Sequence, residues 1–157
     1  MTGGPPLTLA RATPPQLLEM MNWFPSAESC RIWGGPEFRF SFSAETFRAD
    51  CQLLDLPSFA LLDADAALCG FGQYYLRAGR CHLARLVIAP TCRGRGFGTR
   101  LIELLADAGK AALGVEQCSL FVSTTNTAAL ALYQRRGFVR AEYPGGPGLP
   151  GAYYMVR

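Results

Sequence analysis

Histidine and lysine are almost missing from this chain. It has one histidine, His82, and one lysine, Lys110, so that fourteen of the fifteen basic residues are arginines. Six cysteines are present, but no two of them form a Cys-x-x-Cys pair. A zinc site needs several such ligands at close spacing, so the sequence predicts no metal centre. We expect the six cysteines to be reduced thiols that are mostly buried.

Long hydrophobic runs and clusters of like charge are missing as well. Arginine or aspartate interrupts every apolar run well short of the ~20 residues that a bilayer requires, which argues against a membrane span. Residues 1–16 hold no basic stretch followed by a long apolar one, so we expect no secretory signal and a cytoplasmic location. The net charge of +3 comes without a basic run, and the arginines are dispersed. Nucleic acid is therefore not an expected partner.

The composition is that of a folded domain. Half of the 157 residues are hydrophobic and 17% are charged, which excludes disorder as the main state. A chain of this length buries roughly two-thirds of its unfolded surface, enough for a core without disulfides or metal. We therefore expect one domain over residues 1–157.

The hydrophobic pattern predicts an α/β fold with strands on both sides of a central helix. Helices are expected from Pro14, and over residues 26–33, 43–53, 97–113 and 127–136. Strands are expected over residues 7–10, 58–63, 66–76, 81–89, 117–123, 138–143 and 153–157, the second to fourth forming an antiparallel meander.

The most informative segment joins the strand at 81–89 to the central helix. Its loop has glycine at positions 94, 96 and 98, and glycine lets the backbone approach a ligand closely. The first turn of a helix offers unpaired N–H groups and the positive end of the helix dipole. With Arg93, Arg95 and the Thr99 hydroxyl nearby, the segment predicts a binding site for a phosphate or diphosphate.

Two common phosphate motifs do not fit this loop. The nucleoside-triphosphate loop needs Gly-Lys-Ser/Thr, and the dinucleotide fingerprint needs a different glycine spacing. Residues 93–98, Arg-Gly-Arg-Gly-Phe-Gly, instead match Arg/Gln-x-x-Gly-x-Gly/Ala. Residues 126–138 match Asn-x-x-Ala-x-x-Leu-Tyr-x-x-x-Gly-Phe. Both blocks, in this order, resemble the GCN5-related N-acetyltransferase (GNAT) superfamily.

The resemblance implies a fold, a co-substrate and a reaction. The fold would be a mixed, mostly antiparallel central sheet with a splayed, bulged strand, flanked by helices. Residues of about 81–138 would form the coenzyme A-binding core, and about 1–60 the variable acceptor side. Acetyl-CoA would give its acetyl group directly to a primary amine of a small molecule or peptide, in a ternary complex. The resemblance also allows a homodimer.

Site residues follow from the same resemblance. The coenzyme would pair with the backbone of the strand before the loop and bind the loop and the next helix. The expected coenzyme-binding residues are Leu86, Val87, Ile88, Arg93, Gly94, Arg95, Gly96, Phe97, Gly98, Thr99, Asn126, Ala129, Leu132 and Tyr133. Asn126 and Tyr133 are two helical turns apart and so share a face.

Catalysis would need an acid and a base. Tyr133 resembles the family's acid for the leaving thiolate, since its phenol and a thiol have neighbouring pKa values. His82 stands near the point where some relatives carry a glutamate base. A histidine can accept an ammonium proton, although a packed histidine, or an amine deprotonated in solution, is the alternative.

The acceptor pocket is expected from the variable region. Trp33, Glu37, Phe38 and Tyr154 are the candidates, because aromatic residues can line an amine site and a carboxylate can bind an ammonium. An aromatic core under short helices explains the same residues without a ligand. The alternative function is a non-catalytic, regulatory module that binds acyl-CoA.

Overall fold

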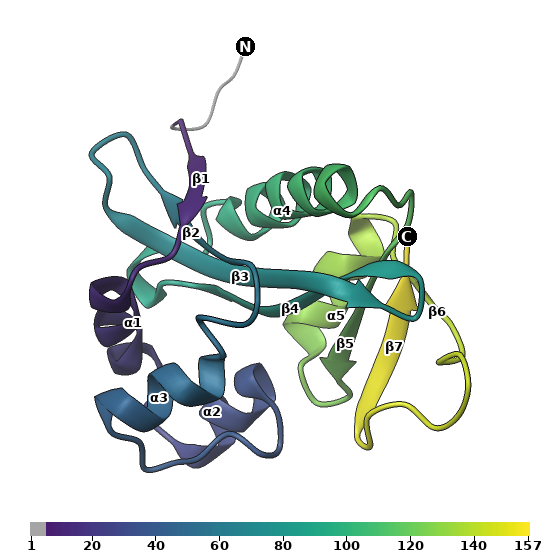
Figure 1. Cartoon of the computed structure of the whole chain (residues 1–157), viewed down its shortest axis with the longest axis horizontal. Helices are drawn as coiled ribbons and strands as arrows, with labels where there is room; N and C mark the ends of the chain where they lie inside the picture. Colours follow the sequence, from purple (N-terminus) through teal and green to yellow (C-terminus); the bar gives the residue numbers. More distant parts are fainter. Residues whose placement is uncertain (1–5) are drawn as a thin grey trace.

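The computed structural model describes residues 6–157, built around one seven-stranded sheet (Figure 1). The strand order is β1-β2-β3-β4-β5-β7-β6, and all neighbouring strands are antiparallel except β4 and β5. The strands are β1 (Thr8–Arg11), β2 (Ser58–Leu62), β3 (Leu68–Arg77), β4 (Arg80–Ile88), β5 (Cys118–Ser123), β6 (Val139–Arg140) and β7 (Ala152–Val156). The expected meander is the β2–β3–β4 part of this sheet.

Five α-helices and two short 3-10 turns connect the strands. They are α1 (Pro14–Met20), η1 (Met21–Trp23), α2 (Ala27–Gly34), α3 (Ala44–Cys51), η2 (Pro90–Cys92), α4 (Phe97–Leu113) and α5 (Thr127–Arg135). Ser26 and Ser43 cap α2 and α3, each accepting a bond from the backbone N–H three residues on. Gly114 ends α4 in the left-handed conformation, as expected for a C-terminal glycine.

The two faces of the sheet carry different helices. On β3, Phe71 packs toward Trp33 of α2, whereas a Cβ on the next residue, Gly72, would contact Leu101 and Leu105 of α4. Alternate residues of a strand point to opposite faces. Therefore α2 and α3 cover one face, and α4 covers the other, as Figure 1 shows.

Helix α4 lies very close to the sheet. At Gly109, a Cβ would stand 2.5 Å from Cys81 Sγ and 3.0 Å from Cγ of the Tyr74 ring. Only a residue without a side chain fits between the helix backbone and these two groups. The close approach fixes α4 over β3 and β4, and so positions its N-terminal turn at the end of β4.

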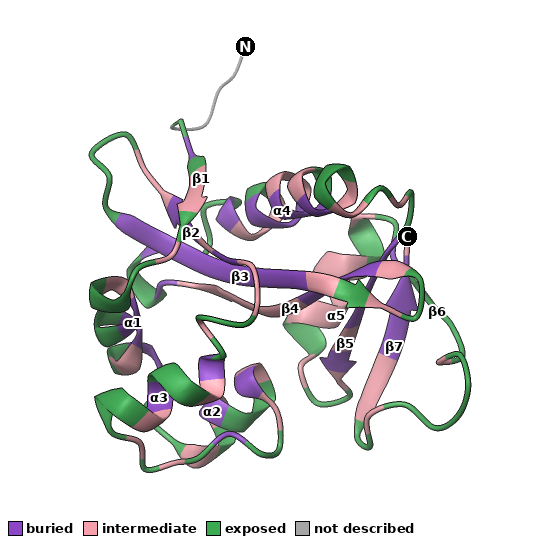
Figure 2. Cartoon of the chain, viewed as in Figure 1, coloured by how far each residue is buried: buried purple, intermediate pink, exposed green. Residues whose placement is uncertain are grey.

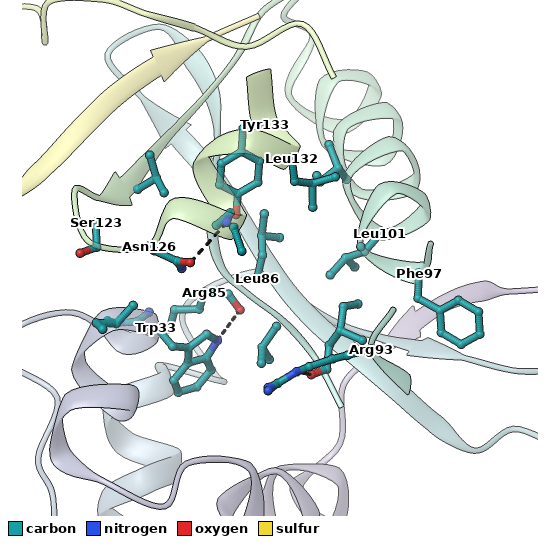
Figure 3. A pocket seen from close by; sticks show the side chains of 18 of the residues that line it. Trp33, Arg85, Leu86, Arg93, Phe97, Leu101, Ser123, Asn126, Leu132 and Tyr133 are labelled. Carbon is teal, nitrogen blue, oxygen red and sulfur yellow. Dashed lines mark hydrogen bonds between the residues drawn. The ribbon is translucent and has the colours of Figure 1, made fainter. Parts of the chain in front are cut away.

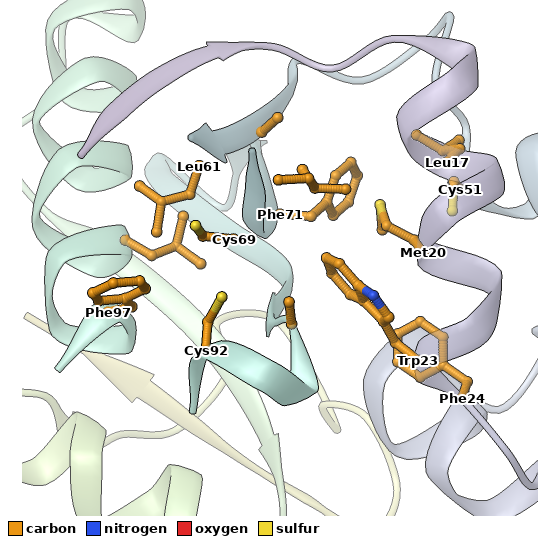
Figure 4. Close-up of a cluster of buried hydrophobic side chains, with 14 of the residues drawn as sticks. Leu17, Met20, Trp23, Phe24, Cys51, Leu61, Cys69, Phe71, Cys92 and Phe97 are labelled. Atoms are coloured by element: carbon orange, nitrogen blue, oxygen red, sulfur yellow. The ribbon is translucent and has the colours of Figure 1, made fainter. Parts of the chain in front are cut away.

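The core extends over both faces (Figure 2). The cluster in Figure 4 includes Leu17 and Met20 of α1, Trp23 and Phe24 of the following segment, and Phe71 of β3. The expectation for the cysteines is confirmed, because all six are free and buried.

The C-terminal hairpin differs from the sequence prediction. The strand expected over residues 138–143 is only the two residues of β6, which pair with Val156 and Met155 of β7. Phe138 belongs to the core instead, at 1% exposure. Over residues 6–157, no helix has the length and apolarity needed to cross a bilayer.

Candidate functional site

Strands β4 and β5 separate shortly after they meet. Their parallel register holds where Cys81 faces Cys118 and His82 faces Ser119, and no later pair of the two strands is in register. The rest of β4, including Leu86–Ile88, therefore has a sheet partner only in β3 among the described strands. Backbone groups on the β5 side are left free for a ligand that can lie as an added strand.

A bulge in β4 follows shortly after its last pair with β5. The pairing of β3 with β4 shifts between Phe71 and Gln73, and Arg85 on the bulged strand has a φ of 51°. A bulge adds a residue to one strand and bends it away from its neighbour. The splayed, bulged strand that the family resemblance implied is thus present, and its centre is Arg85.

A cleft of about 850 Å³ opens at the separation (Figure 3). This volume lies within the range of ligand sites. All of the expected coenzyme residues except Arg95 line it, namely Leu86, Val87, Ile88, Arg93, Gly94, Gly96, Phe97, Gly98, Thr99, Asn126, Ala129, Leu132 and Tyr133. Two blocks that are well separated in sequence thus share one cavity.

The glycine loop forms one end of the cleft. Gly94 and Gly96 have φ values of 75° and 80°, and a Cβ at either position would meet nothing within 4 Å. Gly96 is also the N-cap of α4, and neither a side-chain cap nor an acidic residue occupies the first turn. The N–H groups of that turn therefore have no side-chain cap, and their residues border the cavity at the positive end of a seventeen-residue helix. This end of the cleft is suited to a phosphate or diphosphate group.

The two arginines of the loop differ in direction. Arg93 lines the cleft, and its Nε donates to the carbonyl oxygen of Ile88 at 3.1 Å. Arg95 does not line the cleft, because its guanidinium lies over the Phe97 ring at 4.6 Å. The structure therefore leaves Arg93 as the only arginine of this loop that borders the cavity.

Tyr133 projects into the cleft from α5 (Figure 3). Its ring packs edge-on against Phe138, with centroids 5.9 Å apart. No described residue forms a hydrogen bond with its hydroxyl, and burial raises the pKa of Tyr133 to about 12. The phenol thus keeps its proton at neutral pH and can donate it inside the cleft. Asn126, two turns earlier, also caps α5, since its Oδ1 accepts from the N–H of Ala129 at 3.3 Å.

His82 does not border the cleft, and its surroundings do not support the predicted role as general base. It is 3% exposed, and its Nδ1 lies 2.9 Å from the Ser119 hydroxyl, at the point where β4 and β5 are still paired. The ring packs against Tyr75, Phe121 and Tyr154. Burial lowers the pKa of His82 to about 3, with a smaller contribution from the charge of Arg77. A histidine in this environment stays neutral and is a poor proton acceptor.

Of the expected acceptor residues, one lines the cleft. Trp33 stacks on Phe24 with ring centroids 4.2 Å apart and borders the cavity. Phe38 is 3% exposed and belongs to the core, while Glu37 is exposed at the end of α2 and does not border the cavity. Tyr154 is also buried and borders a separate cavity of about 470 Å³ beside β7.

Sequence reasoning missed the residue at the centre of the bulge. Arg85 borders the cleft, and the indole N–H of Trp33 donates to its carbonyl oxygen at 2.8 Å (Figure 3). Arg85 lies in a predicted strand, and nothing in the sequence of that strand predicts a left-handed backbone at this position. The left-handed conformation belongs to the shift in pairing with β3. Among residues 6–157, the charged residues of the lining are Arg85, Arg93 and Arg135, and none is a carboxylate.

Comparison with known proteins agrees with this geometry. The sequence profile of the acetyltransferase (GNAT) family matches residues 20–138. Mycothiol acetyltransferase of Clavibacter michiganensis is 36% identical over 84 residues, which are 52% of this chain and 27% of that protein. The chain thus spans about a quarter of the length of this curated relative.

Two solved structures share the whole fold. Spermidine N-acetyltransferase from Vibrio cholerae, in complex with CoA and spermine, has a TM-score of 0.72 at 21% identity, covering 96% of this chain and 94% of that one. The aminoglycoside acetyltransferase AAC(6')-Ib, in complex with coenzyme A, has a TM-score of 0.73 at 20% identity, covering 97% and 94%. The profile match extends over most of the chain and includes both motif blocks and the splayed strands, so the protein belongs to the GNAT acetyltransferase family.

Proposed function

We propose that this protein is an acetyl-CoA-dependent N-acetyltransferase that transfers an acetyl group directly to a primary amine of a small molecule or peptide. The observation that carries the proposal is one continuous cleft. It joins the free N-terminal turn of α4, the unpaired side of β4 and the Tyr133 hydroxyl. These are an anion site, an edge for an extended chain and a proton donor.

The lining suits acetyl-CoA as co-substrate. The diphosphate would bind the N–H groups of residues 96–99, with Arg93 adding charge. The pantetheine arm would lie along Leu86–Ile88 and pair with their backbone, which β5 leaves free. Solved relatives whose fold this chain shares hold coenzyme A, which supports the assignment.

The reaction needs no covalent enzyme intermediate. The neutral amine attacks the thioester carbonyl, the C–N bond forms, and the C–S bond breaks. Tyr133 gives its proton to the departing sulfur and regains a proton from solvent. The attacking nitrogen, which is positively charged after the C–N bond forms, loses its extra proton to solvent. A backbone N–H of β4 near the carbonyl would stabilise the negative charge on oxygen as an oxyanion donor. Burial raises the pKa of Tyr133 to about 12, which keeps the phenol protonated at neutral pH but makes it a weaker acid toward the departing sulfur.

The test is Tyr133→Phe, with Tyr153→Phe as the matched control. Tyr153 lies under Arg140 on β7 and does not border this cleft. We expect Tyr133→Phe to lower kcat about 100-fold, the usual scale for a lost general acid, with acetyl-CoA affinity within threefold of wild type. Release of coenzyme A against a panel of amines gives kcat, and calorimetry gives the affinity.

The alternative function is a regulatory module that binds acyl-CoA without catalysis. Such a protein would bind acetyl-CoA in calorimetry but release no coenzyme A with any amine. Unchanged kcat in Tyr133→Phe, measured where chemistry limits the rate, would remove the acid role from this tyrosine. Transfer of radiolabelled acetyl to the protein itself, without an amine, would contradict the ternary-complex mechanism.

A further inference from the structure

Arg85 borders the cleft, and hydrogen bonds hold its guanidinium in one orientation. Arg85 is half-buried, and its Nη1 donates to the Gln73 amide oxygen at 3.0 Å, while its Nε donates to the Gly34 carbonyl at 3.3 Å. These contacts join the bulge of β4 to α2. Leu86 points the other way, since a Cβ on Gly72 would lie 2.7 Å from Leu86 Cδ2 on the α4 face. Arg85 thus belongs to the face opposite α4.

A buried network orients the guanidinium. Gln73 is 0% exposed, and its Nε2 donates to the Cys51 carbonyl at 2.6 Å and to the Ser58 hydroxyl at 2.9 Å. With both donors of its amide in use, the only atom that Gln73 can turn toward Arg85 is its oxygen. The Gln73 amide is therefore fixed in orientation, and it fixes the Arg85 guanidinium in turn.

No carboxylate of the described chain neutralises Arg85. The ion pairs over residues 6–157 do not include it. Asp50 is near enough for the charge of Arg85 to help lower its pKa, but Asp50 is bound at both oxygens by Arg39, at 2.8 and 3.1 Å. A half-buried guanidinium that has only neutral acceptors retains the capacity to bind an anion, and its geometry favours a carboxylate.

Apolar side chains lie beside the backbone of Arg85 and along the cleft it borders. Trp33 is fixed beside it by the hydrogen bond from its indole N–H to the Arg85 carbonyl, and Phe24 stacks on the indole. Ile32 and Phe121 also border this cavity. Among the described residues that line the cleft there is no aspartate, glutamate or histidine, so a second ammonium group of a polyamine would find no charged partner there.

We propose that the acceptor is an amine that also carries a carboxylate and a large apolar side chain, a free aromatic or aliphatic α-amino acid, and that Arg85 binds its carboxylate. This rests on the proposed N-acetyltransferase function. The charge of Arg85 also favours the neutral form of the nearby amine, because a like charge disfavours the ammonium. The cleft can therefore work without a residue that acts as base.

The experiment compares amines that differ only at the carboxylate. The probes are L-tryptophan, L-phenylalanine and L-leucine, against tryptamine, phenethylamine, L-phenylalaninamide and spermidine. We expect kcat/KM for L-phenylalanine or L-tryptophan to exceed that of its decarboxylated partner at least tenfold. L-Phenylalaninamide separates carboxylate binding from amine basicity, because its amine loses a proton more readily than that of phenylalanine.

Two variants of Arg85 test whether its side chain causes the higher kcat/KM of the amino acid over its decarboxylated partner, the acid-to-amine ratio. Arg85→Gln should bring the acid-to-amine ratio close to one, while Arg85→Lys should keep part of it. Arg93→Gln is the matched control, because it removes an arginine at the other end of the same cleft. It should raise the KM for acetyl-CoA and leave the ratio as in wild type. A purely structural role for Arg85 would change all amines alike and leave the ratio unmoved.

The assays distinguish recognition of the carboxylate by Arg85 from acetyl transfer itself. The inference would be overturned if spermidine or the decarboxylated amines release coenzyme A and the amino acids show no higher kcat/KM. The proposed acetyltransferase function would then still hold. If no amine of the panel turns over, calorimetry with N-acetyl-L-phenylalanine and coenzyme A decides, and absent binding overturns it. No binding of acetyl-CoA at all would instead contradict the proposed function.

Discussion

The loop before α4 allows the anion site to be tested separately from the fold. Gly96 and Gly114 flank the same helix, have φ values of 80° and 68°, and would each direct a Cβ into open space. A side chain in the left-handed conformation costs about 1–2 kcal/mol at either position. For a chain of this size, Gly96→Glu and Gly114→Glu should therefore each lower Tm by roughly 2–8 °C.

Their effects on coenzyme binding should differ strongly. A carboxylate ~6 Å from a bound phosphate would repel it by about 3 kcal/mol at an effective dielectric constant of ~20, which is a loss of about 100-fold in affinity. The seventeen residues of α4 separate Gly114 from this point by about 25 Å, beyond the screening length of ~10 Å. Gly114→Glu should keep the wild-type affinity. Calorimetry with coenzyme A measures both, and equal affinities would refute an anion site at this helix end.

Two further predictions concern the buried groups around the site. The folded pKa of His82 is below its unfolded value, so its neutral form stabilises the fold above about pH 6.5 and this stability is lost as pH falls toward 3. Wild type should lose about 3 kcal/mol more than His82→Asn between pH 6.5 and pH 4 in urea titrations, and parallel losses would show that His82 titrates normally. Gly109→Ala should lower the free energy of unfolding by about 1–3 kcal/mol through its contact with Cys81 Sγ, although alanine favours a helix by ~1 kcal/mol. Cys81→Ala should reduce that cost, and a neutral or stabilising Gly109→Ala would contradict the close packing of α4.

The sequence predicted the coenzyme side of the site well because its signals are local. Glycines at a helix start, and Asn126 and Tyr133 on one helix face, depend on spacing within a single element. The N- and C-terminal ends of α4 were predicted at Phe97 and Leu113 for the same reason, because a periodic apolar face and Gly114 define them.

The acceptor side could not be predicted in the same way because it depends on tertiary contacts. Whether His82 faces a cleft depends on where β4 leaves β5, and the two strands separate only after His82. The orientation of Arg85 depends on hydrogen bonds with Gln73 and Trp33, which are twelve and fifty-two positions away in sequence. Single-residue patterns contain no information about such pairings.

The most direct test of the central claim is a crystal structure of the protein with coenzyme A. We expect the diphosphate on the N–H groups of residues 96–99, the pantetheine arm beside Leu86–Ile88 and the sulfur within hydrogen-bonding reach of the Tyr133 hydroxyl. Coenzyme A bound outside the gap between β4 and β5, or with its sulfur far from Tyr133, would contradict it.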